Sequence, residues 1–186
     1  MRVVVGITGA SGVVIAFRLL EELKTRNCDL RAMISHHAEG VIRHEMGEQF
    51  TKTGGIQYYQ ERDPDSPLNS SSFVFDAMVV VPCSMKSLAA ITTGYSESLI
   101  ARCAENALRT GSKLILVPRE TPLSETALSN MLTMKRAGAL ILPPMTAYYT
   151  NPETIADVTN FFVGKILDLL NLPNDLYPRW SDRTEA

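Results

Sequence analysis

The chain has 186 residues, of which 45% are hydrophobic and 20% are charged, and these values predict one folded domain with a substantial core. A formal net charge of -2 gives no electrostatic reason to expect a nucleic acid or an anionic membrane as a partner. No apolar run reaches the roughly 18 to 20 residues that cross a bilayer, and the first residues do not resemble a signal peptide. Three cysteines without Cys-x-x-Cys spacing predict reduced thiols in a cytoplasmic protein.

Apolar runs of strand length alternate with helical patterns along the chain. Strands are expected over 2–7, 29–34, 77–82, 113–117 and 139–142, and helices over 12–24, 37–46, 85–92, 97–110, 124–137 and 152–170. This alternation predicts an α/β fold: a single-domain, three-layer, Rossmann-like or flavodoxin-like parallel sheet with helices on both faces. Asn151 is expected to cap the last helix, with Pro152 in its first turn.

A polar segment over residues 47–72 interrupts the alternation between the second helix and the third expected strand. It is rich in Gly, Ser, Asp, Asn and Pro. A connection of this length is uncommon in a compact domain unless it is functional or mobile. We therefore expect one domain over 1–186 with a polar loop at 47–72 and a C-terminal tail at 171–186.

A glycine-rich turn follows the first expected strand, where residues 6–12 read GITGASG. A strand that turns into a helix here directs unpaired backbone N–H groups and the positive end of the helix dipole at one point. The spacing is Gly-x-x-Gly-x-x-Gly and not the Gly-x-Gly-x-x-Gly of dinucleotide binders. It predicts a phosphate or a nucleotide at this turn, and the alternative is a tight turn that needs glycine only for its backbone angles.

The residues that follow the other expected strands are also polar, and open sheets bind ligands at these carboxyl ends. Ser35 stands where a dinucleotide-binding fold places an acidic residue, which disfavours NAD and suits a hydroxyl donor to phosphate. Residues 82–87 read PCSMKS and predict a second anion site. The alternative is that Ser, Thr and Pro only mark loops and helix caps.

Five segments, taken in order, resemble one known family. They are 6–12 (GITGASG), 81–87 (VPCSMKS), 116–122 (LVPRETP), 142–149 (LPPMTAYY) and 178–180 (PRW). The chain resembles the UbiX-like flavin prenyltransferases, which include the B-type partner proteins of hydroxyaryl acid decarboxylases, and the resemblance covers almost its whole length. Such enzymes join the dimethylallyl group of dimethylallyl phosphate to N5 and then C6 of reduced FMN. The prenylated FMN that results is the cofactor of a separate UbiD-type decarboxylase.

The resemblance implies a role for individual residues of this flavin-binding domain. The implied FMN-binding set is Gly9, Ala10, Ser11, Ser35, Ser84, Met85, Lys86, Ser87 and Arg119. The implied set around the allylic phosphate, part of it supplied by a neighbouring subunit, is Arg102, Arg109, Arg119, Glu120, Tyr149 and Lys165. The implied catalytic residues are Ser11, Glu45, Arg119 and Glu120, with Glu45 removing a proton during ring closure beside Ser11.

The chemistry of a departing phosphate is consistent with these basic residues, because developing negative charge needs cationic hydrogen-bond donors. No metal is predicted, since Asp63 and Asp65 are the nearest approach to an Asp-rich motif. Lys165 stands where many relatives have Arg and lacks its bidentate fork. The alternative for Arg109 is a surface ion pair, and for Glu45 an ordinary glutamate at a helix end.

The family forms closed oligomers, commonly dodecamers, so the resemblance implies a homo-oligomer to whose shared site the tail at 177–180 contributes. Two other functions stay open. An FMN-dependent cysteine-type decarboxylase shares this fold, but its Pro-Ala-x-Ala-Asn-Thr motif is replaced here by residues 82–87. A non-catalytic FMN carrier accounts for the phosphate sites but not for the donor set. Cys83 is expected to be a buried packing residue and not a reactive thiol.

Overall fold

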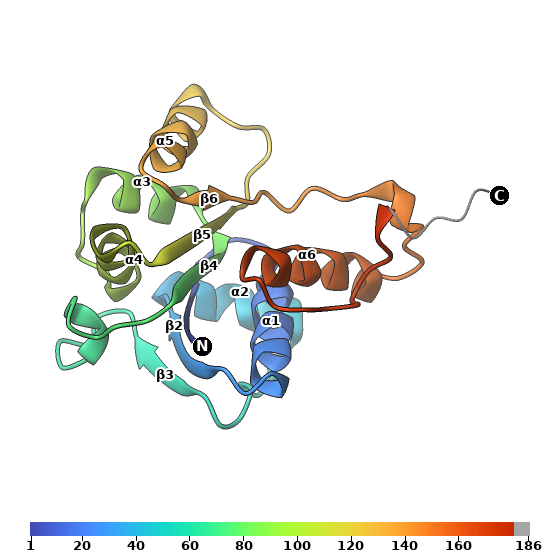
Figure 1. The fold of residues 1–186 in the computed structure, drawn as a ribbon, viewed down its shortest axis with the longest axis horizontal. Coiled ribbons are helices and arrows are strands. Elements are labelled where there is room, and N and C mark those ends of the chain that lie inside the picture. Colours follow the sequence, from blue (N-terminus) through green and yellow to red (C-terminus); the bar gives the residue numbers. More distant parts are fainter. Residues whose placement is uncertain (181–186) are drawn as a thin grey trace.

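The computed structural model describes residues 1–180, in which six parallel strands form one sheet with the order β3-β2-β1-β4-β5-β6 (Figure 1). The strands are β1 (Arg2–Ile7), β2 (Asp29–Ile34), β3 (Gln57–Gln60), β4 (Ala77–Cys83), β5 (Lys113–Pro118) and β6 (Leu140–Ile141). The strand order reverses between β1 and β4, and open parallel sheets bind their ligands at such a switch point.

Helices cover both faces of the sheet, which confirms the predicted α/β architecture (Figure 1). One face carries α1 (Val13–Thr25), α2 (His36–Met46) and α6 (Ile155–Leu169), and α1 packs against both of the others. The other face carries α3 (Met85–Thr93), α4 (Leu99–Thr110) and α5 (Glu125–Arg136). Two short 3₁₀ helices, η1 (Pro67–Asn69) and η2 (Tyr148–Thr150), lie in the connections.

The core forms two apolar clusters, one on each face of the sheet. Val3 and Val5 of β1 belong to the cluster under α1 and α6, whereas Val4 belongs to the cluster under α3 and α4. This division follows from the alternation of side chains along a strand. Every residue of β4 is buried, as expected for a central strand that is covered on both faces.

The carboxyl ends of the central strands are tied together by a buried threonine. The Thr8 hydroxyl donates to the carbonyl of Pro82 at 2.7 Å and accepts from the backbone N–H of Ser84 at 2.8 Å. The backbone N–H of Arg119 donates to the carbonyl of Cys83 at 3.1 Å. These bonds hold the loops that follow β1, β4 and β5 in one crevice.

Two sequence expectations were wrong in detail. The segment 57–60 inside the polar loop forms β3, which pairs with β2 as an edge strand; four residues at an edge carry too short a pattern to be recognised. Helix α6 begins after Thr154, whose side chain forms a capping box with Asp157. Asn151, the expected cap, instead adopts a left-handed backbone (φ 47°) that ends η2.

An extended arm leads away from the sheet between β6 and α6 (Figure 1). The arm, residues 142–154, carries η2 near its tip, and α6 runs back from there toward the sheet. The chain after α6 returns along this helix toward η2, and the last residues of the expected tail, 181–186, lie outside the described part. No helix within residues 1–180 is long and apolar enough to span a membrane.

Candidate active site at the carboxyl ends of the strands

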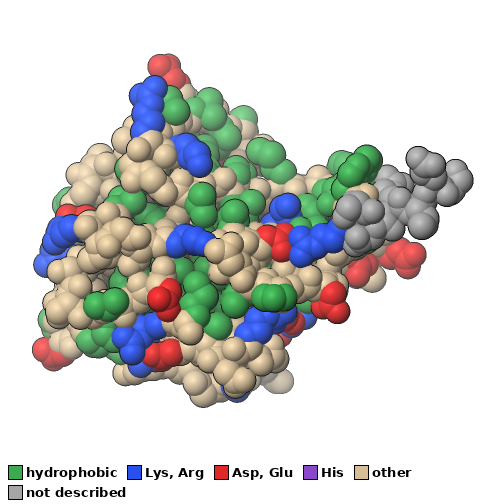
Figure 2. All heavy atoms as spheres, viewed as in Figure 1, with side chains coloured by type: hydrophobic (Ala, Val, Ile, Leu, Met, Phe, Trp, Pro, Cys, Tyr) green, Lys and Arg blue, Asp and Glu red, His purple; other side chains and the backbone are tan. Residues whose placement is uncertain are grey.

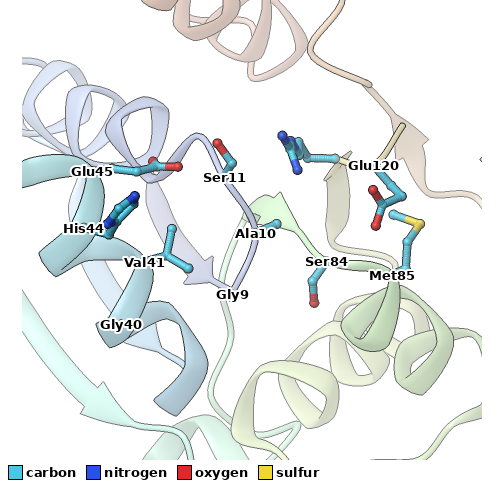
Figure 3. A pocket seen from close by; sticks show the side chains of 11 residues that line it. Gly9, Ala10, Ser11, Gly40, Val41, His44, Glu45, Ser84, Met85 and Glu120 are labelled. Atoms are coloured by element: carbon cyan, nitrogen blue, oxygen red, sulfur yellow. The ribbon is translucent and has the colours of Figure 1, made fainter. Parts of the chain in front are cut away.

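A hollow of about 520 Å³ lies at the switch point between β1 and β4. The loops after β1, β4 and β5 form its floor and one wall, and α2 forms the opposite wall (Figure 3). Its lining contains eight residues that the sequence assigned to flavin binding or catalysis: Gly9, Ala10, Ser11, Glu45, Ser84, Met85, Arg119 and Glu120. Gly40, Val41 and His44 of α2 complete the lining, and the sequence analysis gave them no role.

Glu45 contacts the N-terminus of α1 from across this hollow. Gly12, the N-cap residue of α1, has a left-handed backbone (φ 97°) and no side chain that could accept hydrogen bonds from the first turn. The Glu45 carboxylate accepts from the N–H of Gly12 at 3.1 and 3.0 Å and from that of Val13 at 3.1 Å. These two N–H groups were expected to be unpaired and are instead paired with a carboxylate from α2; a phosphate at this turn stays a prediction.

Close packing explains the glycine at position 9. A Cβ atom built on Gly9 would lie 2.6 Å from the Cβ of His37, which is far inside normal contact distance. The loop after β1 therefore approaches the first turn of α2 as closely as a backbone without a side chain permits.

A second hollow of about 980 Å³ adjoins the first, and Gly9 and Ser84 line both. Its lining includes Ser35, Lys86 and Ser87, which the sequence assigned to a phosphate. Ser35 and Ser84 cap α2 and α3 by accepting from the N–H groups of Ala38 and Ser87, both at 3.2 Å. Two helix N-termini and Lys86 thus face one space and favour an anion there, whereas Glu39, Glu61 and Glu97 of the same lining oppose it.

The polar loop forms the rim of the second hollow, a role that its sequence did not reveal. Glu61 accepts from the N–H of His36 at 2.9 Å and so adds to the cap of α2. Arg62 contacts Glu97 at 2.5 Å, and the Tyr95 hydroxyl donates to the same carboxylate at 2.7 Å. This bridge joins the loop after β3 to the connection between α3 and α4. Only a folded chain brings these segments together.

Cys83 ends β4 beside both hollows and is completely buried. Burial raises the pKa of its thiol to about 12, so the neutral thiol is the form present at neutral pH. Its role is packing, as the sequence analysis expected.

Four residues of the implied donor set line neither hollow. Arg102 and Arg109 lie exposed on α4, and Arg109 pairs with Glu105 one turn away at 2.5 Å. Tyr149 lies on η2 in the arm, and Lys165 lies on α6. Within residues 1–180, no group of three or more His, Cys, Asp or Glu side chains is arranged to hold a metal ion.

Comparison with known proteins identifies the family. The model of the flavoprotein family matches residues 1–167. The flavin prenyltransferase UbiX of Methanocaldococcus jannaschii is 46% identical over 182 residues, which cover 97% of this chain and 98% of that protein. The chain belongs to the flavin prenyltransferase family.

Two solved relatives have the same fold. The crystal structure of AnUbiX in complex with FMN and dimethylallyl pyrophosphate has a TM-score of 0.88 at 39% identity, over 96% of each chain. A dodecameric FMN-dependent UbiX-like decarboxylase from Escherichia coli O157:H7 has the same TM-score at 36% identity, over 97% of this chain and 99% of that one.

Proposed function

We propose that this chain transfers a dimethylallyl group to reduced FMN and so makes prenylated FMN. The observation that carries the proposal is the pair of joined hollows at the switch point, where an anion site with two helix N-termini meets a space walled by Arg119, Glu120 and Glu45. This pairing suits a phosphate-bearing flavin with a second phosphate ester beside its ring. The names of the relatives and the ligands of AnUbiX support the same activity.

In this proposal FMN is bound by the nine residues that the sequence assigned to it. Ser35, Ser84, Lys86 and Ser87 hold its phosphate in the second hollow. The Ser35 hydroxyl accepts from the backbone of α2 and so keeps its own proton free to donate outward. Gly9, Ala10, Ser11, Met85 and Arg119 border the flavin ring in the first hollow.

The reaction requires a cation for the leaving group and a base for the flavin protons. Arg119 stabilises the phosphate as the carbon–oxygen bond of the donor breaks, with Glu120 beside it. Bond formation at N5 and then at C6 releases the hydrogen of each of these flavin atoms as a proton, and the second step also consumes the double bond of the prenyl group, which takes up one proton. We assign removal of the C6 proton to Glu45 with Ser11 as its neighbour. The donor is the monophosphate or the pyrophosphate, since a solved relative binds the latter.

The remaining donor residues, Arg102, Arg109, Tyr149 and Lys165, are proposed to act across subunit contacts in a closed homo-oligomer, a dodecamer as in the E. coli relative. The projecting arm supports this arrangement, because Met145 and Tyr148 are exposed on it. Figure 2 shows hydrophobic side chains at the surface of the projecting part. Each subunit, residues 1–186, is proposed to act as one flavin-binding unit in the cytoplasm, consistent with three free thiols, and to deliver its product to a UbiD-type decarboxylase.

The test is anaerobic incubation with reduced FMN and either dimethylallyl phosphate or its pyrophosphate, followed by mass spectrometry of the extracted flavin. We expect a flavin heavier by one five-carbon unit that activates an apo-decarboxylase of the UbiD type. The Arg119→Ala variant is the control and should return unmodified FMN. Unmodified FMN from the loaded wild-type protein would favour an FMN carrier. Release of carbon dioxide from a peptide with a C-terminal cysteine would favour the cysteine-type decarboxylase.

A further inference from the structure

Asp168, near the end of α6, forms hydrogen bonds with the chain segment that follows this helix. The Asp168 carboxylate accepts two bonds from the Arg179 guanidinium, at 2.6 and 2.8 Å, in the bidentate geometry that makes such pairs strong. It also accepts from the Tyr177 hydroxyl at 2.5 Å and from the Asn174 amide at 2.8 Å. Three residues of the segment 174–180, which we call the tail strap, are thus fixed to one carboxylate.

The tail strap also packs tightly against α6 through Tyr177. A Cβ atom built on Gly164 would lie 2.5 to 2.7 Å from the Tyr177 ring, so this position of the helix admits only glycine without a shift of the ring. The Arg179 guanidinium lies over the same ring, 4.5 Å from its centroid. Tyr177 is buried as a result, and the strap follows α6 toward η2 (Figure 1).

The tail strap contacts two residues that the proposed function assigns to the donor phosphate. The Lys165 ammonium lies 5.6 Å from the centroid of the Tyr177 ring, a distance at which a cation is attracted to an aromatic face. The ring of Tyr149 meets the Trp180 ring edge to face at 5.2 Å. Tyr149 and Lys165 come from the arm and from α6, and the strap contacts both; Phe161 of α6 also meets the Tyr149 ring, with 6.4 Å between centroids.

We propose that Asp168 is a positioning residue for the prenyl donor: it fixes the tail strap, and the strap holds Tyr149 and Lys165 in the arrangement that binds the donor phosphate. The inference rests on the proposed function, because it concerns the second substrate of that reaction. Asp168, Tyr177 and Arg179 line neither hollow. Loss of the strap should therefore weaken donor binding and leave FMN binding unchanged.

The experiment compares wild type with Asp168→Asn, which keeps the shape of the side chain but removes the charge that pairs with Arg179. We expect the KM for dimethylallyl phosphate to rise about tenfold with kcat and the Kd of FMN unchanged, since a displaced binding group weakens ground state and transition state together. Trp180 is the only tryptophan of the chain, so its emission reports directly on the strap. Because Trp180 is already 66% exposed, the readout is its emission anisotropy, which should shift to a lower value in the variant as the released strap gains mobility.

Two further variants separate positioning from general damage. Gly164→Ala pushes on Tyr177 without changing any charge and should raise the same KM. Asp29→Asn is the matched control, because Asp29 also pairs with two arginines, but these are Arg2 of β1 and Arg31 of β2 and not residues of the tail strap. It should alter neither the KM nor the Trp180 emission.

The outcomes are distinct. An Asp168→Asn enzyme whose Trp180 emission shifts while its KM stays at the wild-type value would show that the strap is only structural. An unchanged emission would show that Asp168 does not hold the strap at all. Wild-type protein that makes no prenylated flavin would instead overturn the proposed function, and with it the role of the strap, whatever the emission shows.

Discussion

Glu45 caps a helix in the structure, and the proposed reaction assigns it a second role. Its oxygens accept bonds from Gly12 and Val13 and so cap α1, and the proposed reaction uses it as the acceptor of a proton. Because α2 lies beside the loop that contains Ser11, these capping bonds place the Glu45 carboxylate next to that loop (Figure 3). The two roles predict different results for different substitutions.

Glu45→Gln is expected to bind FMN normally but to form prenylated FMN about a hundredfold more slowly in a single turnover. The amide oxygen still accepts from the α1 backbone, whereas an amide is too weak a base for the flavin proton. Glu45→Ala also loses the cap and should reduce the free energy of unfolding by about 1 kcal/mol. A wild-type rate in the glutamine variant would remove Glu45 from the proton transfer.

At the scale of elements, the contact between the β1 loop and α2 depends on Gly9. Gly9→Ala places a methyl group 2.6 Å from His37, and we expect it to lower the free energy of unfolding by about 1 to 3 kcal/mol. Gly40→Ala in the same helix is the matched control. Nothing lies within 4 Å of a Cβ there, so this change should stabilise the protein by about 0.5 to 1 kcal/mol.

Denaturant unfolding followed by circular dichroism measures the free energy of unfolding of wild type and of both glycine variants. Effects of the same sign and size in the two variants would contradict the close approach at Gly9, because only that position has a neighbour to displace.

The tail strap should respond to acid. Burial alone would raise the pKa of Asp168, but hydrogen bonds from Arg179, Tyr177 and Asn174 outweigh it and lower the pKa below the ordinary value of 3.8. A lowered pKa means that the charged form stabilises the docked strap above about pH 4. This stabilisation is lost as the pH falls through the pKa of Asp168 in the folded protein.

We therefore expect the emission anisotropy of Trp180 to stay constant from pH 7 to about pH 4 and to shift to a lower value below it. Far-UV circular dichroism over the same range distinguishes release of the strap from acid unfolding of the whole chain. In the Asp168→Asn variant the emission should already be shifted at pH 7 and show no step. A step of equal size in both proteins would assign the transition to other groups.

At the scale of the whole molecule, the proposed site is divided between distant regions of the chain. Arg119 lines the hollow at the switch point, whereas Tyr149 lies on the arm that projects from the sheet (Figure 1). If the two regions meet across a subunit contact, oligomers that mix Arg119→Ala chains with Tyr149→Phe chains should contain some complete sites.

Co-expression of these two variants with different affinity tags tests the division of the site. Mixed oligomers purified through both tags should form prenylated FMN faster than either variant alone. Mixed oligomers that are no faster than the pure variants would place the complete site within one chain.

The sequence predicted the parallel sheet and its helices well, because buried central strands and amphipathic helices carry strong local patterns. It also predicted that Ser84 and Arg119 lie at the same edge of the sheet, because the carboxyl ends of parallel strands meet there. It missed β3, which is short and lies at an edge. It misplaced the start of α6, where Asn151 and Thr154 are both acceptable caps and only Thr154 has Asp157 three residues later to complete a capping box.

By itself the sequence determined the fold class, the family and the residues at the strand ends, because each follows from local patterns or from contiguous motifs. Only the tertiary structure decided that Glu45 of α2 occupies the N-terminus of α1, that Glu61 and Arg62 border the second hollow, and that Asp168 holds the tail strap. These contacts join segments far apart along the chain. Their partners are fixed by packing of the folded chain, and no local spacing encodes which side chains will meet.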